Sequence, residues 1–137
     1  MDPHLLKLAV GCVDVAMAAV SWLILLCTYP DFARWRADGF AAAHEAYTGR
    51  VGWVVGPLLL AQLAGHVLWW ARTGDLLGVA LVAVVWLLTG LWSVPCHRRL
   101  QREGPASPAL ASLWRSHAWR TAAWTILAAA SFRQAAG

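Results

Sequence analysis

The sequence predicts an all-α fold, an integral membrane protein whose helices form an antiparallel four-helix bundle. Of its 137 residues, 60% are hydrophobic and only 13% are charged, against about 25% charged residues in a typical soluble domain. The mean hydropathy is +0.55. A soluble domain of this size could not bury so much apolar surface. So little charge also excludes an intrinsically disordered chain.

The apolar residues fall into segments that are long enough to cross a membrane. A bilayer core of about 30 Å requires about 20 helical residues. Four segments meet this length and cover about residues 5–29, 51–71, 76–95 and 113–132. Short connections make neighbouring helices antiparallel. The whole chain, residues 1–137, is therefore predicted to be a single transmembrane domain.

The second and third helices are predicted to extend beyond the bilayer on one side. Phe40, His44 and Tyr47 precede the second span at helical spacing, so this helix begins before the membrane does. In the third helix, Pro95 is expected to bend the chain without ending the helix, because the following residues continue a helical pattern. Gly104 then ends it.

Proline and small residues predict where helices end and where they pack. Tyr29-Pro30 is expected to end the first helix. Gly52 and Gly56 lie one turn apart on the second helix, and Gly65 follows further along it. Small residues allow helices in a membrane to approach closely, so these positions are predicted to be packing contacts.

Positive charge predicts the orientation in the membrane. The connections after the first and third helices carry Arg34, Arg36, Arg50, Arg98, Arg99 and Arg102. The other side carries Lys7, Arg72 and Arg133. The excess places the first group in the cytoplasm, so we expect a multi-pass protein of the inner (cytoplasmic) membrane. The net charge of +4 suits anionic membrane lipids as partners, not nucleic acid. The sequence leaves a homo-oligomer open.

Ionisable residues gather at the end of the bundle that is predicted to be cytoplasmic. They come from three segments: His44, Tyr47, Arg50, His97, His117 and Arg120. Polar side chains inside a membrane bundle are costly unless they pair or serve a function. We therefore predict a site in which His44, Tyr47 and Arg120 are catalytic. In the alternative interpretation, these side chains reach out to lipid headgroups and anchor the helix ends.

Two kinds of chemistry fit such a site. His44, His97 and His117 could together bind a transition metal such as Cu, Fe or Zn, because imidazole is the commonest protein ligand for these ions. Without a metal, a neutral histidine could take a proton from a lipophilic phenol-like or carbonyl substrate. Arg120 would then stabilise the anion that forms.

A second group of polar residues is predicted deeper in the bundle. Asp14 lies near the middle of the first span, and Gln62 lies within the second. Asp14 is expected either to hold helices together or to belong to a deep site. His66 is expected to form a hydrogen bond between helices.

The spacing of these residues resembles that of a known family. The motifs are Phe40-x-x-x-His44-x-x-Tyr47-x-x-Arg50, Pro57-Leu58-Leu59-Leu60-x-Gln62, Ser93-Val94-Pro95-x-His97-x-x-Leu100-x-x-x-Gly104 and Trp119-Arg120-Thr121-x-x-Trp124-Thr125. They are similar to those of small, uncharacterised bacterial four-helix membrane proteins, which in turn resemble anthrone-oxygenase-like membrane proteins. The resemblance covers about residues 30–125. The sequence departs from the pattern at Gln62, where the family would have an acidic residue, and at His117, where it would have asparagine.

Together these observations favour a membrane-embedded enzyme of the oxygenase or oxidoreductase type, with a lipophilic small molecule as its substrate. The alternative is a non-enzymatic bundle that binds lipid or serves as an accessory subunit of a membrane complex.

Overall fold

The computed structural model describes residues 2–136 of the chain, and side chains as far as residue 132. Its helices are α1 (Pro3–Leu23), η1 (Ile24–Thr28), α2 (Tyr29–Phe32), α3 (Phe40–Thr73), α4 (Leu76–Leu88), η2 (Thr89–Ser93), α5 (Val94–Glu103) and α6 (Ala109–Ala136). The segments η1 and η2 are short π-helical turns. Because α1–η1–α2 and α4–η2–α5 are each continuous, the protein consists of four helical rods.

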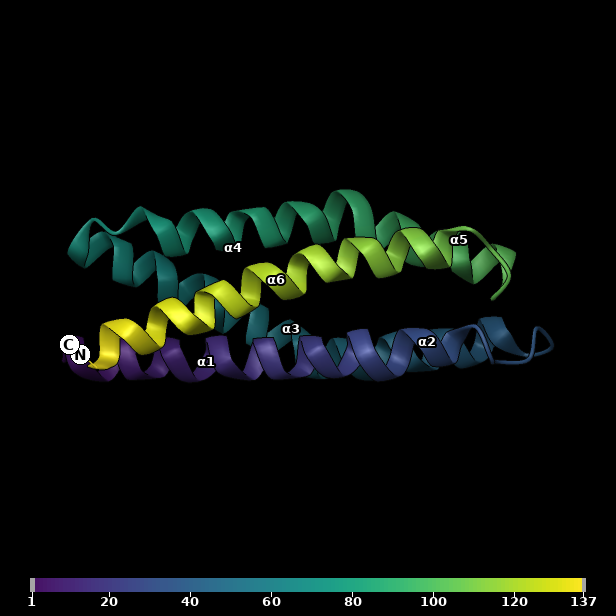
Figure 1. The fold of residues 1–137 in the computed structure, drawn as a ribbon, viewed down its shortest axis with the longest axis horizontal. Helices are drawn as coiled ribbons and strands as arrows, with labels where there is room; N and C mark the ends of the chain where they lie inside the picture. The colour runs from purple at the N-terminus through teal and green to yellow at the C-terminus, as the bar shows by residue number, and fades with distance from the viewer. Residues whose placement is uncertain (1, 137) are drawn as a thin grey trace.

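The four rods lie side by side along the long axis of the molecule (Figure 1). Both termini lie at one end, and the connections into α3 and α6 lie at the other. The α1 rod contacts α3 and α6, and α4 also contacts α3 and α6. All four rods therefore enclose a common interior.

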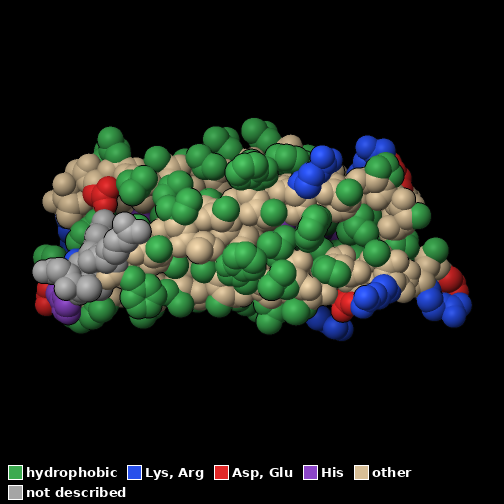
Figure 2. Space-filling view, viewed as in Figure 1, with side chains coloured by type: hydrophobic (Ala, Val, Ile, Leu, Met, Phe, Trp, Pro, Cys, Tyr) green, Lys and Arg blue, Asp and Glu red, His purple; other side chains and the backbone are tan. Residues whose placement is uncertain are grey.

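Three of the rods are long and apolar enough to cross a membrane: Pro3–Phe32, Phe40–Thr73 and Leu76–Glu103. Hydrophobic side chains cover the middle of the visible face, and many of its Lys and Arg side chains lie toward the end that carries α2 and α5 (Figure 2). The fourth rod, α6, is a helix of 28 residues but is not among these three. Its hydropathy is lowered by arginines and by buried polar side chains such as Ser116, His117 and Thr121.

The predicted helix limits are largely confirmed. The second helix begins at Phe40, well before the predicted span, and continues through Pro57. The third continues past Pro95 to Glu103. Between α3 and α4, Gly74 has a φ of 74°, a left-handed conformation that glycine adopts without strain. Its amide donates to the carbonyl of Trp70, which ends α3.

The prediction that Tyr29-Pro30 ends the first helix is wrong. A π-helical turn precedes the proline, and the helix continues to Phe32. Proline lacks an N–H group, and its ring collides with the carbonyl four residues earlier. A wider turn before the proline separates its ring from that carbonyl, so the helix can continue without the missing hydrogen bond. The π turn η1 directly precedes Tyr29-Pro30, and η2 directly precedes Val94-Pro95. The chain therefore uses the same solution in both rods, at the same end of the molecule.

The glycines predicted as packing contacts behave differently from one another. A Cβ atom at Gly65 would lie 2.8 Å from Cγ2 of Val10, so α1 and α3 approach closely there. A Cβ atom at Gly52 or Gly56 would meet nothing within 4 Å. Of the three, only Gly65 is a tight helix–helix contact.

Candidate functional site

A cavity of about 600 Å³ lies between the rods, toward the end that carries α2 and α5. Its lining includes all five residues of the predicted catalytic and metal sets: His44, Tyr47, His97, His117 and Arg120. They come from α3, α5 and α6. Arg50 does not line this cavity, and its side chain is exposed. The structure therefore brings the predicted site residues to one place but leaves Arg50 outside it.

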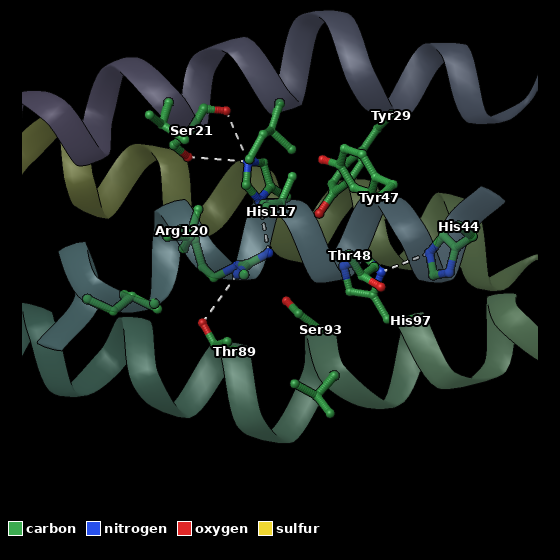
Figure 3. A pocket seen from close by; sticks show the side chains of 18 of the residues that line it. Ser21, Tyr29, His44, Tyr47, Thr48, Thr89, Ser93, His97, His117 and Arg120 are labelled. Carbon is green, nitrogen blue, oxygen red and sulfur yellow. Dashed lines mark hydrogen bonds between the residues drawn. The ribbon is translucent and has the colours of Figure 1, made fainter. Parts of the chain in front are cut away.

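The lining divides into a polar part and an apolar part. The aromatic and polar side chains are gathered around Tyr29, Tyr47, His97 and Arg120 (Figure 3). Apolar side chains complete the lining: Met17, Val20, Val51, Val55 and Leu59. Such a surface suits a lipophilic molecule that carries a small number of polar groups.

His44 and His97 form a hydrogen-bonded pair that Gln101 orients. Nε2 of Gln101 donates to the backbone carbonyl of Ala41 at 2.7 Å, so Oε1 of Gln101 faces His44 as an acceptor. Nδ1 of His44 lies 2.5 Å from this oxygen, and Nε2 of His44 lies 3.1 Å from Nδ1 of His97. Because Oε1 of Gln101 can only accept, Nδ1 of His44 is assigned the proton.

This assignment fixes the next hydrogen bond. A neutral His44 protonated at Nδ1 has its lone pair on Nε2, so Nδ1 of His97 donates to it. The lone pair of His97 then lies on Nε2, which has no hydrogen-bond partner among the described residues. The edge of His97 that points away from His44 is turned toward Tyr29 and Tyr47 (Figure 3). His97 is therefore placed to act as a base, and His44 supports it.

His117 makes hydrogen bonds through both ring nitrogens. Nε2 lies 3.0 Å from the backbone carbonyl of Ser21, which can only accept, so Nε2 carries a proton. Nδ1 accepts from Nη2 of Arg120 at 2.8 Å. The imidazole is also in edge contact with Tyr29, at 4.9 Å between ring centroids. His117 thus holds Arg120 in place and has no free nitrogen.

Arg120 is a buried cation, and the side chains that contact it, Thr89, His117 and Trp124, carry no negative charge. Its residue exposure is 7%. Nη1 donates to the hydroxyl of Thr89 at 3.3 Å, and the guanidinium carbon lies 5.7 Å from the ring centroid of Trp124. Nε has no hydrogen-bond partner among the described residues, and none of their carboxylates forms a salt bridge with Arg120. The cavity therefore contains a positive charge that a bound anion could neutralise.

The histidines do not fit a shared metal ion in this arrangement. Among the described residues, no group of three or more His, Cys, Asp or Glu side chains is placed to hold one. Both nitrogens of His44 and both nitrogens of His117 already contact protein groups. Only His97 retains an available lone pair, and one imidazole does not make a metal centre.

Sequence reasoning missed several supporting residues. Gln101 lies one helical turn after His97, and this spacing is the signal that could have revealed it. Thr89 and Ser21 support Arg120 and His117 from other rods. Isolated hydroxyl groups in apolar helices gave no such signal, because serine and threonine commonly bond to their own backbone.

A second polar cluster lies deeper, and it involves α1, α3 and α6. Asp14 is fully buried and accepts from Nε2 of Gln62 at 2.7 Å and from the hydroxyl of Ser131 at 2.6 Å. Nε2 of His66 lies 3.1 Å from both of its carboxylate oxygens. The predicted helix–helix hydrogen bond of His66 is thereby confirmed. Of the two roles predicted for Asp14, the structure supports the one that holds helices together.

The two clusters meet at Trp124. Its indole N–H donates to Oε1 of Gln62 at 3.1 Å, and its ring lies beside Arg120. The deeper cluster therefore sets the position of one wall of the cavity.

Comparison of the chain with protein-family models, with curated proteins and with solved structures finds no match.

Proposed function

We propose that the protein is a membrane-embedded enzyme of the oxidoreductase type that acts on a lipophilic small molecule. In this proposal the four rods cross the membrane in alternating directions, and the end with the cavity faces the cytoplasm. The long apolar rods support membrane insertion, and the arginine-rich connections at the cavity end support the orientation.

A single observation carries the proposal: a free base and an unneutralised cation face the same cavity. The base is Nε2 of His97, whose tautomer Gln101 sets through His44. The cation is the guanidinium of Arg120, which His117 holds. A base beside a fixed positive charge can remove a proton and stabilise the anion that results.

The substrate that fits this pair has an acidic C–H or O–H group conjugated with an oxygen. His97 takes the proton, and the negative charge moves to the substrate oxygen beside Arg120. For a substrate R₂CH₂, the carbanion adds O₂ and regains a proton to give R₂CH–OOH, which loses water to give R₂C=O. The overall reaction R₂CH₂ + O₂ → R₂C=O + H₂O is balanced, and molecular oxygen is the oxidant.

The resemblance to anthrone-oxygenase-like proteins supports this choice of chemistry, because an anthrone is a substrate of this kind. No step passes through a metal, since the histidines do not form a ligand set. A chelator is therefore not expected to change turnover.

The test is oxygen uptake by the full chain in lipid vesicles, with a hydroxyanthrone as the substrate. His97→Ala should lower turnover by about 10²–10⁴-fold, which is the usual contribution of a general base. His4→Ala is the matched control, because His4 is exposed and belongs to α1 near the N-terminus. Equal turnover in the two variants would contradict the proposed role of His97.

The alternative function, binding of a lipid or another hydrophobic ligand without turnover, is favoured by one observation. The cavity is open on one side and has a large apolar part. Native mass spectrometry in detergent distinguishes the two functions. A lipid that co-purifies, together with the absence of oxygen uptake, would support the alternative.

A further inference from the structure

The cavity has an open side between α3 and the η2–α5 segment. Several residues of its lining are exposed, and they come from these two rods: Glu45 and Gly52 from α3, and Val94 and Arg98 from α5. The opposite wall is closed by buried residues such as Met17 of α1 and Trp124 of α6. A molecule can therefore reach the interior from the α3–α5 side.

Glycines form the α3 edge of this opening. Gly52 and Gly56 both line the cavity, and a Cβ atom at either position would meet nothing within 4 Å. The GxxxG spacing suggested helix packing, but within this chain the two glycines leave space instead. The absence of side chains keeps the opening wide where a bulky residue would narrow it.

The opening extends from the predicted hydrocarbon layer to its border. Gly52 and Gly56 lie in the predicted span 51–71, and Val94 lies in the span 76–95. Glu45 and Arg98 lie just outside these spans. The apolar part of the opening would therefore face lipid chains, and the charged part would lie at the headgroups.

We propose that the substrate is a neutral, lipid-soluble aromatic molecule that enters sideways from the hydrocarbon layer, between α3 and η2–α5. This inference rests on the proposed function, since it concerns the molecule on which His97 and Arg120 act. The negative charge forms only after the molecule has arrived beside these two residues. A molecule that was already charged would face the cost of crossing lipid.

The lining agrees with an aromatic ligand. Tyr29 lies near His97 and beside His117, the residue that holds Arg120, with ring-centroid distances of 6.2 Å to His97 and 4.9 Å to His117. Tyr47 and Trp124 also line the cavity. A flat aromatic molecule can contact these rings and still present one oxygen to Arg120.

The test compares side chains of increasing size at two glycines of α3. Gly52→Ala, Gly52→Val and Gly52→Phe progressively fill the opening. The same three changes at Gly49 are the matched control, because Gly49 is exposed, also has nothing within 4 Å of a Cβ atom, and does not line the cavity. Thermal unfolding of each variant shows whether the fold is retained.

The probe is a 1-naphthol with an alkyl chain, loaded into the vesicle membrane, and its binding is followed by stopped-flow fluorescence. Gly52→Phe should slow binding by about tenfold or more, within the range over which association rates vary among variants of one site. The Gly49 series should leave the rate within about twofold. Naphthalene-1-sulfonate, which is permanently anionic, should bind far more slowly than the naphthol.

Equal rates in the two series, or sulfonate binding as fast as naphthol, would overturn the sideways route. The proposed function would survive that result, because oxygen uptake and its dependence on His97 are measured separately. If the unchanged protein bound no naphthol at all, the route would be overturned, and oxygen uptake would still decide the proposed function.

Discussion

The two polar clusters of this bundle are built from similar residues but satisfy their hydrogen bonds to different degrees. Around Asp14, three donors from two other rods meet both carboxylate oxygens. Around the cavity, Nε of Arg120 has no partner among the described residues, and His97 bonds to His44 through Nδ1, which leaves its Nε2 for the cavity. Both carboxylate oxygens of Asp14 are occupied, whereas the second cluster leaves groups available for a ligand.

This difference in hydrogen bonding indicates that the Asp14 cluster serves stability and the cavity cluster serves function. A fully satisfied buried network stabilises and orients the helices that contribute to it. A buried cation without an anion costs stability, so its presence in the cavity is better explained by what it binds. Substitutions in the two clusters should therefore have opposite signatures: the Asp14 cluster affects unfolding, and the cavity affects turnover.

The largest effect is expected from Asp14→Ala. It leaves Gln62, His66 and Ser131 without their shared acceptor, and each buried donor that is left unsatisfied costs about 1–3 kcal/mol. Thermal unfolding in detergent measures this change. Asp75→Ala is a less buried control at the start of α4, where the side chain caps the helix. The comparison would fail if Asp14→Ala unfolded no more easily than this control.

Arg120→Met is expected to reduce turnover by about 10²–10³-fold, which is typical for the loss of one electrostatic stabiliser of a developing anion. Its unfolding temperature should stay equal or rise, because a buried charge without a counter-ion is removed. Oxygen uptake and thermal unfolding are measured together. Arg115→Met is the control, since Arg115 lies exposed on the same helix. If Arg120→Met were strongly destabilised but kept normal turnover per folded molecule, Arg120 would have a role in stability and not in turnover.

A smaller effect, about fivefold in turnover, is expected for Gln101→Leu, because loss of one neutral hydrogen bond costs about 1 kcal/mol. The change removes the acceptor that sets the tautomer of His44, so the pH dependence of turnover should also shift. Gln101→Glu retains an acceptor and should restore most of the activity. If Gln101→Leu kept both the rate and the pH profile of the unchanged protein, His97 would not depend on this chain of hydrogen bonds.

The sequence predicted most of the helices because their apolar lengths and their stop signals are local. The start of α3 at Phe40, its passage beyond the membrane, and the end of α5 before Gly104 all follow from nearby residues. The first helix was cut short at Tyr29-Pro30, since a proline normally ends a helix and a π turn leaves no separate mark in the sequence. On α6, buried polar residues lower the hydropathy of a helix that the sequence predicts as a span.

The membership of the candidate site was also predictable, but the division of roles within it was not. Helical spacing and the alternation of helices placed His44, Tyr47, His97, His117 and Arg120 together. Which imidazole keeps a free lone pair depends on Gln101, Ser21 and Arg120; the first two contacts join separate rods, and the third lies within α6. The sequence therefore could not predict that His44 pairs with His97 while His117 bonds elsewhere.

The two π turns have a consequence for the chain beyond them. Each turn holds one residue more than an α-helical turn, and one residue corresponds to about 100° around a helix axis. Tyr29 follows η1, and His97 follows η2 within its rod. Their inward direction thus depends on the number of residues before them as much as on their identity. A one-residue deletion in either turn would rotate the aromatic wall or the base out of the interior while leaving the composition of the rod almost unchanged.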